Sequence, residues 1–331
     1  MKKVLLINPT IQPRGVEILA SGSDVVMAPD GREDTLVSLL SSRDVAAVVT
    51  RVERITARIL GNAPGLVVIG QHGVGVDNID VRSATEHGVL VVNAPASNFV
   101  SVAEHAVMLM LALSRRLCES NAAVRRDDFQ FRERWFPTEI NGKVVLAVGL
   151  GRVGSEVARK CRLGFNMEVL ACDPHVSESD MAAAGVKKVR LPEGLGLADV
   201  VSVHVPLTEQ TRHLIGAAEI ARMKPEAFLV NVSRGGVVDQ EALVRALGSA
   251  RLRGAGLDVF DPEPPRPGDP LLELPNVVLT PHFAGDTHEA KQRCSAAIAG
   301  EVLAVLQGRL PKFLVNPEVV RSEKFLRRWT L

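Results

Sequence analysis

Three side chains that could carry out acid–base chemistry follow apolar segments in the second half of the chain. Arg234 follows AFLVNVS, Glu263 comes just after DVFDP, and His282 follows NVVLTP. Histidine gains and loses a proton near neutral pH, a nearby carboxylate stabilises its imidazolium form, and arginine can bind a carboxylate through two N–H groups. A proton donor, an acidic partner and a cation are what hydride reduction of a 2-oxo acid requires. Oxidation of a 2-hydroxy acid would use neutral His282 as the base.

Each of these residues also has a simpler interpretation. A lone arginine after a strand is usually a surface ion-pair partner, a glutamate in a proline-rich loop is usually solvated, and a histidine near a sheet end is often structural. Ligands of open parallel sheets bind beyond the carboxyl ends of the strands. The position of Arg234, Asp258, Glu263 and His282 just after successive predicted strands therefore favours one shared site.

A glycine-rich turn of the kind that binds a dinucleotide follows the apolar segment KVVLAV, with glycines at positions 149, 151 and 154. Gly149 would make the tight turn, Gly151 would let a pyrophosphate approach the backbone, and Gly154 would let a helix pack on the strand. The helix predicted over residues 155–163 would direct unpaired N–H groups, including those of Arg152 and Val153, at the pyrophosphate.

An acidic residue stands where a dinucleotide site needs one. Asp173 ends the next predicted strand, 19 residues after Gly154, where a carboxylate can accept both hydroxyls of an adenosine ribose. Its charge would repel a 2'-phosphate, and neither Pro174 nor His175 supplies an arginine, so the sequence predicts NAD rather than NADP. A chance match of the glycine pattern is the alternative, which the flanking strand, helix and acid argue against.

A second glycine turn, Gly73-Val74-Gly75, also follows a predicted strand. Asn78 occupies the position of the third glycine. We therefore expect this turn to bind something smaller than a dinucleotide.

The elements that must position these residues are short apolar segments alternating with stretches long enough for helices. Continuous apolar strands are typical of parallel sheets buried on both faces. The 331-residue length also favours two domains. The sequence therefore predicts an α/β fold with two doubly wound parallel sheets in tandem. The predicted strands are 4–7, 46–50, 66–69 and 90–92 in the first half, and 144–148, 168–171, 200–203, 228–230, 255–259 and 277–279 in the second.

A buried helix is predicted between the two sheets, over residues 101–117, because Ser101 and Glu104 form a capping-box pattern before an apolar run. The following residues, 119–141, are polar and rich in arginine, with four aromatic rings interspersed. These rings could form a subunit interface or pack on their own domain, and both interpretations stay open. The aromatic residues are Phe129, Phe131, Trp135 and Phe136.

Composition limits the class of protein. The 39 basic and 38 acidic residues give a formal charge of +1 without basic blocks, so neither nucleic acid nor an acidic membrane is an expected partner. Residues 1–8 contain two lysines and only four consecutive apolar residues, too few for a signal or membrane span, and are predicted to be a strand. The cysteines form no C-x-x-C pair, which indicates a reducing, cytoplasmic setting. No cluster has metal-ligand spacing, and His105 is interpreted as a core residue. The cysteines are Cys118, Cys161, Cys172 and Cys294.

Taken together, these segments resemble the D-isomer-specific 2-hydroxyacid dehydrogenase family, which includes phosphoglycerate, glycerate and D-lactate dehydrogenases. The resemblance follows the family's order over nearly the whole chain. The matching segments are GVGVDNID (73–80), SVAEH (101–105), GLGRVG (149–154), HVPLT (204–208), NVSRGGVVD (231–239), LDVFDPEPP (257–265) and TPHFAG (280–285).

The resemblance implies roles for individual residues. Arg234, Glu263 and His282 would be the catalytic set, and Arg234 and His282 would also contact the substrate. The backbone amides of Val74 and Gly75 would bind the substrate carboxylate. The remaining cofactor-binding residues would be Val205, Pro206 and Thr211 on the adenine side, Val232 and Ser233, and Asp258 and Gly285 at the nicotinamide carboxamide.

The resemblance also implies the domain organisation. A discontinuous, flavodoxin-like substrate domain would comprise residues 1–98 and 289–331, and a Rossmann NAD-binding domain would comprise residues 99–288. A cleft between them would close over a small 2-hydroxy or 2-oxo acid. The helix and arm at 101–141 would form a homodimer interface. The chain ends soon after Asn316-Pro317, so no regulatory domain is expected.

Two departures from the family pattern leave the substrate open. Phe283 replaces a more usual aliphatic residue, and His72 stands before the Gly73 turn where an arginine is frequent. Another function on the same fold is an NAD(H)-sensing interaction protein of the corepressor type, although the chain has no long disordered tail. Oxidation of formate or phosphite is a third possibility, but formate dehydrogenases resembling this family have glutamine in place of Glu263.

Overall fold

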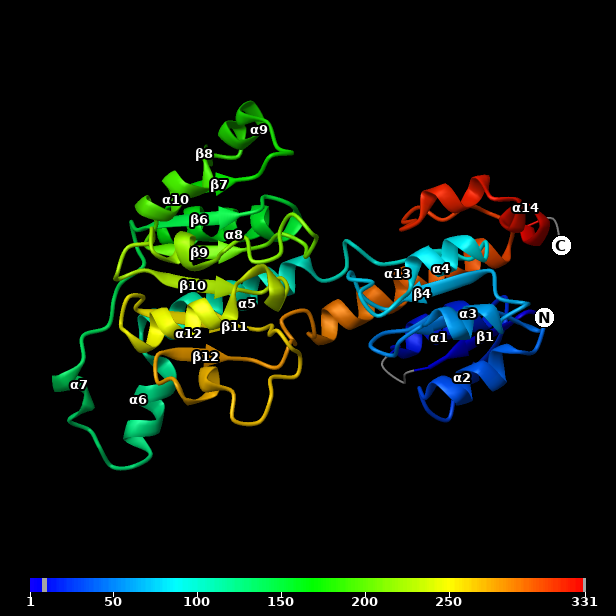
Figure 1. Cartoon of the computed structure of the whole chain (residues 1–331), viewed down its shortest axis with the longest axis horizontal. Coiled ribbons are helices and arrows are strands. Elements are labelled where there is room, and N and C mark those ends of the chain that lie inside the picture. Colours follow the sequence, from blue (N-terminus) through cyan, green and yellow to red (C-terminus); the bar gives the residue numbers. More distant parts are fainter. Residues whose placement is uncertain (8–10, 330–331) are drawn as a thin grey trace. The chain divides into compact units, whose positions relative to one another are not determined.

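Each of two compact units of the chain is built around a parallel sheet with helices on both of its faces (Figure 1). One unit comprises Met1–Asn98 and Asp286–Leu331, and the other comprises Phe99–Gly285. The computed structural model describes residues 1–7 and 11–329, the side chain of Arg328 excepted. Asn8, the end of the first predicted strand, lies outside the described residues.

The five-stranded unit has the strand order β2-β1-β3-β4-β5, and all of its strand pairs are parallel. This is the flavodoxin-like order, with a topological switch point between β1 and β3. The strands are β1 (Lys3–Leu6), β2 (Asp24–Met27), β3 (Val45–Thr50), β4 (Val68–Gln71) and β5 (Leu90–Val92). The helices are α1 (Pro13–Ala20), α2 (Glu33–Leu40), α3 (Ala57–Gly61), α4 (Val81–Glu86), α13 (His288–Leu306), η3 (Pro317–Arg321) and α14 (Glu323–Trp329).

The seven-stranded unit has the order β12-β11-β10-β9-β6-β7-β8, again with parallel pairs throughout. The order reverses between β6 and β9, as it does in Rossmann folds. The strands are β6 (Val144–Val148), β7 (Glu168–Cys172), β8 (Lys187–Lys188), β9 (Val200–Val203), β10 (Phe228–Asn231), β11 (Gly254–Leu257) and β12 (Val277–Leu279). The helices are α5 (Phe99–Ser114), α6 (Leu117–Val124), α7 (Phe131–Arg134), α8 (Arg152–Phe165), α9 (Glu178–Ala183), α10 (Leu191–Leu197), α11 (Ala217–Ile220), η1 (Gly235–Val237), α12 (Gln240–Gly248) and η2 (Pro270–Glu273).

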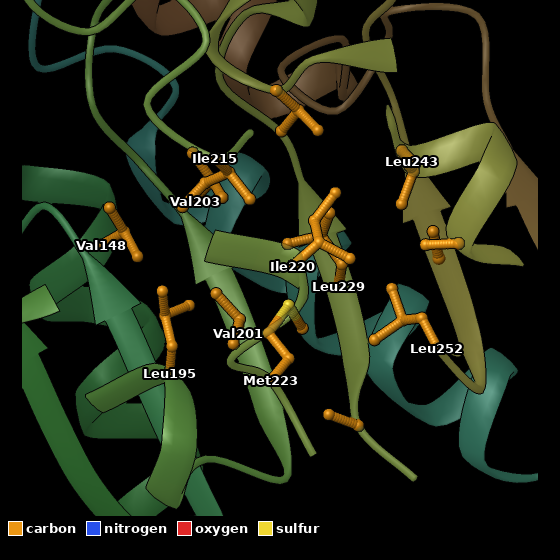
Figure 2. Close-up of a cluster of buried hydrophobic side chains, with 14 of the residues drawn as sticks. Val148, Leu195, Val201, Val203, Ile215, Ile220, Met223, Leu229, Leu243 and Leu252 are labelled. Carbon is orange, nitrogen blue, oxygen red and sulfur yellow. The ribbon is translucent and has the colours of Figure 1, made fainter. Parts of the chain in front are cut away.

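The core of the seven-stranded unit has two layers because successive side chains of a strand point to opposite faces. Leu146 and Val148 of β6 join one cluster with residues of α10, α11 and α12, part of which is drawn in Figure 2. Val145 and Ala147 join the other cluster, against α5 and α8. The five-stranded sheet is likewise covered on one face by α2, α3 and α4 and on the other by α1 and α13. Both faces of both sheets are therefore buried, which confirms the predicted fold class.

The predicted strands are present, with ends that shift by up to two residues, but two observed strands were not predicted. They are β2 and β8, each at one edge of its sheet; the other two edge strands, β5 and β12, were predicted. Strand β8 consists of Lys187 and Lys188 and carries no apolar signal. Strand β2 has three apolar residues, Val25, Val26 and Met27, but most of its side chains are exposed, and this short run was not recognised.

The helix predicted over 101–117 differs at both ends. Helix α5 starts at Phe99 and ends at Ser114, so Ser101 is a buried residue of its first turn rather than its cap. The chain turns at Arg116, which has a left-handed φ of 51°, before α6 begins. The predicted burial is confirmed, since the helix packs on β10 and β11. The second crossing between units lies after Gly285, three residues before the expected position. Among the described residues, no helix is long and apolar enough to cross a membrane.

Candidate active site and cofactor-binding loop

The carboxyl edge of the seven-stranded sheet gathers the residues that were predicted to do chemistry. Since all its strands are parallel, their carboxyl ends lie at one edge. Gly149 follows β6, Asp173 follows β7 and Val205 lies just beyond β9. Arg234, Asp258 and His282 lie just beyond β10, β11 and β12. The fold therefore brings together the glycine-rich turn and the three predicted catalytic residues in one unit.

The glycine-rich turn has the geometry expected of a dinucleotide-binding loop. Gly149 has a φ of +93°, and a Cβ there would lie 2.8 Å from Val205 Cγ1. A Cβ at position 154 would lie 2.1 Å from the carbonyl oxygen of Gly149, so only glycine allows α8 to start so close to the turn. A Cβ at Gly151 would meet nothing within 4 Å. The surface above Gly151 is thus open to an approaching ligand.

Helix α8 begins directly at this turn, at Arg152. Its N-cap is Gly151, which has no side chain to bond the N–H groups of the first turn. Because the first N–H groups of a helix also lack intrahelical acceptors, those of Arg152 and Val153 are suited to an anionic ligand.

Asp173 lies beside the turn and is held by two backbone amides. Its Oδ2 accepts a hydrogen bond from Leu150 N at 2.8 Å, and its Oδ1 accepts one from His175 N at 2.8 Å. A carboxylate oxygen can accept more than one hydrogen bond, so both oxygens retain capacity for the hydroxyls of a ribose. The two backbone amides fix the orientation of the carboxylate and still leave it able to accept further hydrogen bonds.

The segment after β9 closes the other side of the turn. Thr211 Oγ1 donates to Pro206 O at 2.5 Å and accepts from Thr208 N at 2.8 Å, which fixes the turn over residues 206–211. His204 packs beneath the glycines, and burial lowers its pKa to about 3. Within the described residues neither ring nitrogen of His204 has a hydrogen-bond partner. The imidazole is therefore neutral, and it forms the floor of the loop.

The segment after β10 is shaped by a residue that the sequence did not single out. Asn231, 1% exposed, accepts from Ser233 N at 3.0 Å and donates to Arg234 O at 2.9 Å. A Cβ at Gly235 would lie 1.9 Å from Phe260 O, so only glycine allows the Arg234 loop to reach the loop that carries Glu263. Asn231 could have been recognised in the sequence because it is a polar amide at the end of an apolar strand. A buried amide there must form hydrogen bonds, since leaving it unpaired costs free energy. The neighbouring Val232 is buried.

His282 and Glu263 are in direct contact. His282 Nδ1 is hydrogen-bonded to Glu263 Oε1, and Glu263 Oε2 accepts from Phe260 N at 3.4 Å. Burial alone would raise the pKa of Glu263, but the hydrogen bond from His282, its charge, the Phe260 amide and the charge of Arg234 together lower that pKa. Glu263 is thus held as a carboxylate against the imidazole, while Nε2 of His282 is left to face a reactant.

The loop that carries His282 is strained and braced. His282 has a left-handed φ of 51°, which is unfavourable for a residue with a side chain. Its backbone N–H donates to Thr280 O at 3.0 Å. Asp258, 1% exposed, holds both sides of the loop by accepting from Thr280 Oγ1 at 2.6 Å and Ala284 N at 2.9 Å. Phe283 N also donates to Asp258, at 3.1 Å.

His105, whose side chain is only 10% exposed, also belongs to this bracing network. Its Nε2 lies 2.9 Å from Thr280 Oγ1 and 3.5 Å from Asp258 Oδ1, and its ring packs edge-on to Phe283 at 5.3 Å between centroids. Burial lowers its pKa more strongly than the Asp258 charge raises it. The partners of His105 lie more than 150 residues away along the chain, so no local pattern could reveal them.

In the five-stranded unit, the second glycine turn follows β4. Ala94 N donates to Gly73 O at 2.9 Å, and Asn93 Nδ2 donates to Val74 O at 2.7 Å. In a trans peptide the N–H points opposite to the C=O, so the amides of Val74 and Gly75 point away from Asn93 and Ala94. No group of three or more His, Cys, Asp or Glu among the described residues could hold a metal ion.

The strand order and the loop after β6 define a dinucleotide-binding α/β unit, and comparison with known proteins gives its family. Residues 107–284 match the NAD-binding domain of D-isomer specific 2-hydroxyacid dehydrogenases. The chain belongs to this family.

Several relatives are similar over most of the chain. D-3-phosphoglycerate dehydrogenase of Methanocaldococcus jannaschii is 38% identical over 98% of the chain, which spans only 61% of that relative. Glyoxylate reductase of Korarchaeum cryptofilum is 42% identical over 87% of the chain and 84% of the relative. Among solved structures, D-lactate dehydrogenase of Aquifex aeolicus, in complex with NAD and lactic acid, is 30% identical with a TM-score of 0.82, covering 93% of this chain and 96% of the other.

Proposed function

We propose that this chain is an NAD-dependent oxidoreductase that interconverts a small D-2-hydroxy acid and its 2-oxo acid. The contact between His282 and Glu263, beside the Arg234 loop in an NAD-binding unit, is the observation that carries the proposal. The Methanocaldococcus and Korarchaeum relatives are named for oxidation or reduction of such acids, which supports the same reaction class.

The unit formed by Phe99–Gly285 would hold the cofactor. Gly149, Gly151 and Gly154 fit a pyrophosphate at the start of α8, and Asp173 fits an unphosphorylated ribose. Bound NADH would supply the hydride. The other proposed cofactor contacts are Val205, Pro206, Thr211, Val232, Ser233, Asp258 and Gly285.

His282 would act as the general acid in reduction and as the general base in oxidation. Its Nε2 would give the proton to the carbonyl oxygen, while Glu263 stabilises the imidazolium that must exist beforehand. Arg234 would bind the carboxylate of the acid and polarise its carbonyl. In the five-stranded unit, the amides of Val74 and Gly75 would also bind the substrate carboxylate.

The first experiment follows NADH absorbance with hydroxypyruvate, glyoxylate, pyruvate and phosphohydroxypyruvate. We expect NADH to be oxidised with at least one of these acids. The His282→Gln variant should bind NADH as the wild-type chain does, but its kcat should be lower by roughly a hundredfold or more. His288→Gln changes an exposed histidine in the same way and serves as the control. No oxidation with any acid would favour the NAD(H)-sensing interaction protein, and full activity of His282→Gln would exclude its proposed role.

We also propose that the chain forms a homodimer through residues 101–141. Phe129, Trp135 and Phe136 are 64%, 46% and 80% exposed, and the contacts of these rings within the unit include Arg116, 3.8 Å over Trp135, and Arg132, 4.9 Å over Phe129. Exposed aromatic residues are enriched at interfaces. Sedimentation should show a dimer that Phe136→Ser weakens. A monomer at micromolar concentration would contradict this assembly.

The four cysteines carry free thiols, and burial raises the pKa of Cys161 to about 12. This supports a reducing, cytoplasmic setting for the enzyme.

A further inference from the structure

The loop after β3 is an anion-binding loop that the chain fills with its own carboxylate. Glu53 Oε2 accepts from Arg51 N at 3.2 Å, from Val52 N at 3.3 Å and from Thr50 Oγ1 at 3.2 Å. Successive backbone N–H groups that converge on one point make a concavity that attracts anions. This one lies at the carboxyl end of β3, next to the switch point of the five-stranded sheet, where open α/β sheets bind ligands.

The charge of Arg51 in this loop is also neutralised, by a carboxylate of the same unit. The guanidinium of Arg51 pairs with Asp286 Oδ1, and both side chains are about one quarter exposed. The other oxygen of Asp286 lies 3.5 Å from Lys291 Nζ. Arg54 in the same loop is exposed, where solvent and salt screen its charge. The positive charge best placed to bind an anion is therefore already engaged by a carboxylate.

Hydrogen bonds join this loop to the turn proposed to bind the substrate carboxylate. Gln71 Nε2 donates to Arg51 O at 2.8 Å, and Asn78 Nδ2 donates to Glu53 O at 2.9 Å. Residues 71–78 contain Val74 and Gly75, so the two loops form one bonded rim on neighbouring strands. A substrate held at Val74 and Gly75 would have the carboxylate of Glu53 on the adjoining loop. The carboxylate of Asp286, which lies just before α13, pairs with Arg51 of that loop.

We propose that Glu53 and Asp286 restrict the substrate to 2-hydroxy and 2-oxo acids without a second anionic group, and so exclude phosphate esters. The inference rests on the proposed function and names its substrate class. A phosphate dianion at this rim would meet N–H groups that already bond Glu53 and a guanidinium that already pairs with Asp286, so it would have to displace both carboxylates. Gain or loss of one such charge contact near a protein surface changes affinity by about tenfold or more.

The test compares hydroxypyruvate with its phosphate ester at saturating NADH. The wild-type chain should show at least a tenfold higher kcat/KM for the unphosphorylated acid. Glu53→Gln and Asp286→Asn should each shift the ratio toward the ester, by about tenfold, because each removes one charge and keeps the size of the side chain. Asp44→Asn is the matched control. Asp44 precedes β3 at its amino end, is 69% exposed and should leave the ratio unchanged.

A binding experiment separates this inference from the reaction. Isothermal titration with inorganic phosphate should give about tenfold tighter binding to Glu53→Gln than to the wild-type chain. A wild-type preference for the ester, or a ratio that neither variant moves, would overturn the inference. If no 2-oxo acid is reduced, the proposed function fails, and the phosphate titration then decides whether the loop excludes anions.

Discussion

At the scale of single residues, the geometry around His282 depends on one hydroxyl group. The hydroxyl of Thr280 has one proton, and it donates that proton to Asp258. It must then accept from Nε2 of His105, which fixes the proton of neutral His105 on that nitrogen. The backbone carbonyl oxygen of Thr280 also accepts a hydrogen bond from the backbone N–H of His282. The chain of bonds from His105 through Thr280 to Asp258 therefore anchors the strained residue that is proposed to transfer the proton.

Replacement of Thr280 tests this anchor. Thr280→Val keeps the shape but leaves the His105 N–H without its acceptor and Asp258 with one donor fewer, so we expect a loss of about 1–3 kcal/mol of stability. The turnover number should fall while Kd for NADH changes less, because the loop that carries His282 loosens. Thr280→Ser should restore both values, as measured by urea unfolding and steady-state kinetics. Equal stability and activity of the valine variant would contradict the role of the hydroxyl.

Replacement of Asp173 tests the choice of cofactor. Asp173→Ala removes the charge that would repel a 2'-phosphate, so the ratio of kcat/KM with NADH to that with NADPH should fall by about tenfold or more. Glu178→Ala, at an exposed position in α9, provides the control. An unchanged ratio would mean that another residue sets the preference.

At the scale of elements, the close approach of α8 to the turn after β6 positions the proposed pyrophosphate site. Two glycines of this helix differ in their surroundings. A Cβ at Gly154 would collide with the Gly149 carbonyl at 2.1 Å, whereas one at Gly164 would meet nothing within 4 Å. The first glycine is required by packing, and the second only adds flexibility to the helix.

The two glycines make a matched pair of substitutions in one helix. Gly154→Ala should destabilise the chain by about 1–3 kcal/mol and weaken NADH binding, because the helix start must move away from the turn. Gly164→Ala should be neutral or stabilise by up to about 1 kcal/mol, since alanine favours a helix over glycine. Urea unfolding and NADH fluorescence titration measure both effects. If both variants had the same stability and the same affinity for NADH, the close approach of α8 to the Gly149 carbonyl would not require glycine at position 154.

At the scale of the whole molecule, the buried histidines link stability to pH. His72 in the five-stranded unit is 4% exposed and bonded to Ser295 at 2.8 Å. Burial, followed by the charge of Arg51, lowers its pKa to about 4. The unfolded chain binds a proton at this histidine below its ordinary pKa of about 6.5, whereas the folded chain does not until about pH 4. The contribution of neutral His72 to the free energy of unfolding is therefore complete above pH 6.5 and is lost as the pH falls toward 4.

Unfolding experiments at pH 7 and pH 4.5 check this sign. Between these two pH values, the free energy of unfolding of the wild-type chain should fall by about 2 kcal/mol more than that of His72→Gln. His204 acts in the same direction but is present in both proteins, so the difference isolates His72. A parallel decrease in the two proteins would contradict a neutral, buried His72.

The central strands, the glycine-rich turn and the order of the family segments could be predicted from the amino-acid sequence alone. Continuous apolar runs such as 144–148 and 200–203 match β6 and β9 because a strand buried on both faces must be apolar throughout. The glycine spacing at 149–154 predicted the turn because tight turns and close approach constrain residue type locally. These features depend on neighbours along the chain.

Contacts between groups far apart in the chain became known only from the folded structure. Strands β2 and β8 are defined by their pairing with β1 and β7, since β2 has only three apolar residues and β8 has none. The bonds of His105 with Thr280 and of Arg51 with Asp286 join residues 175 and 235 positions apart. Such contacts arise from the packing of whole elements, and that packing is a property of the folded sheets that no local sequence pattern encodes.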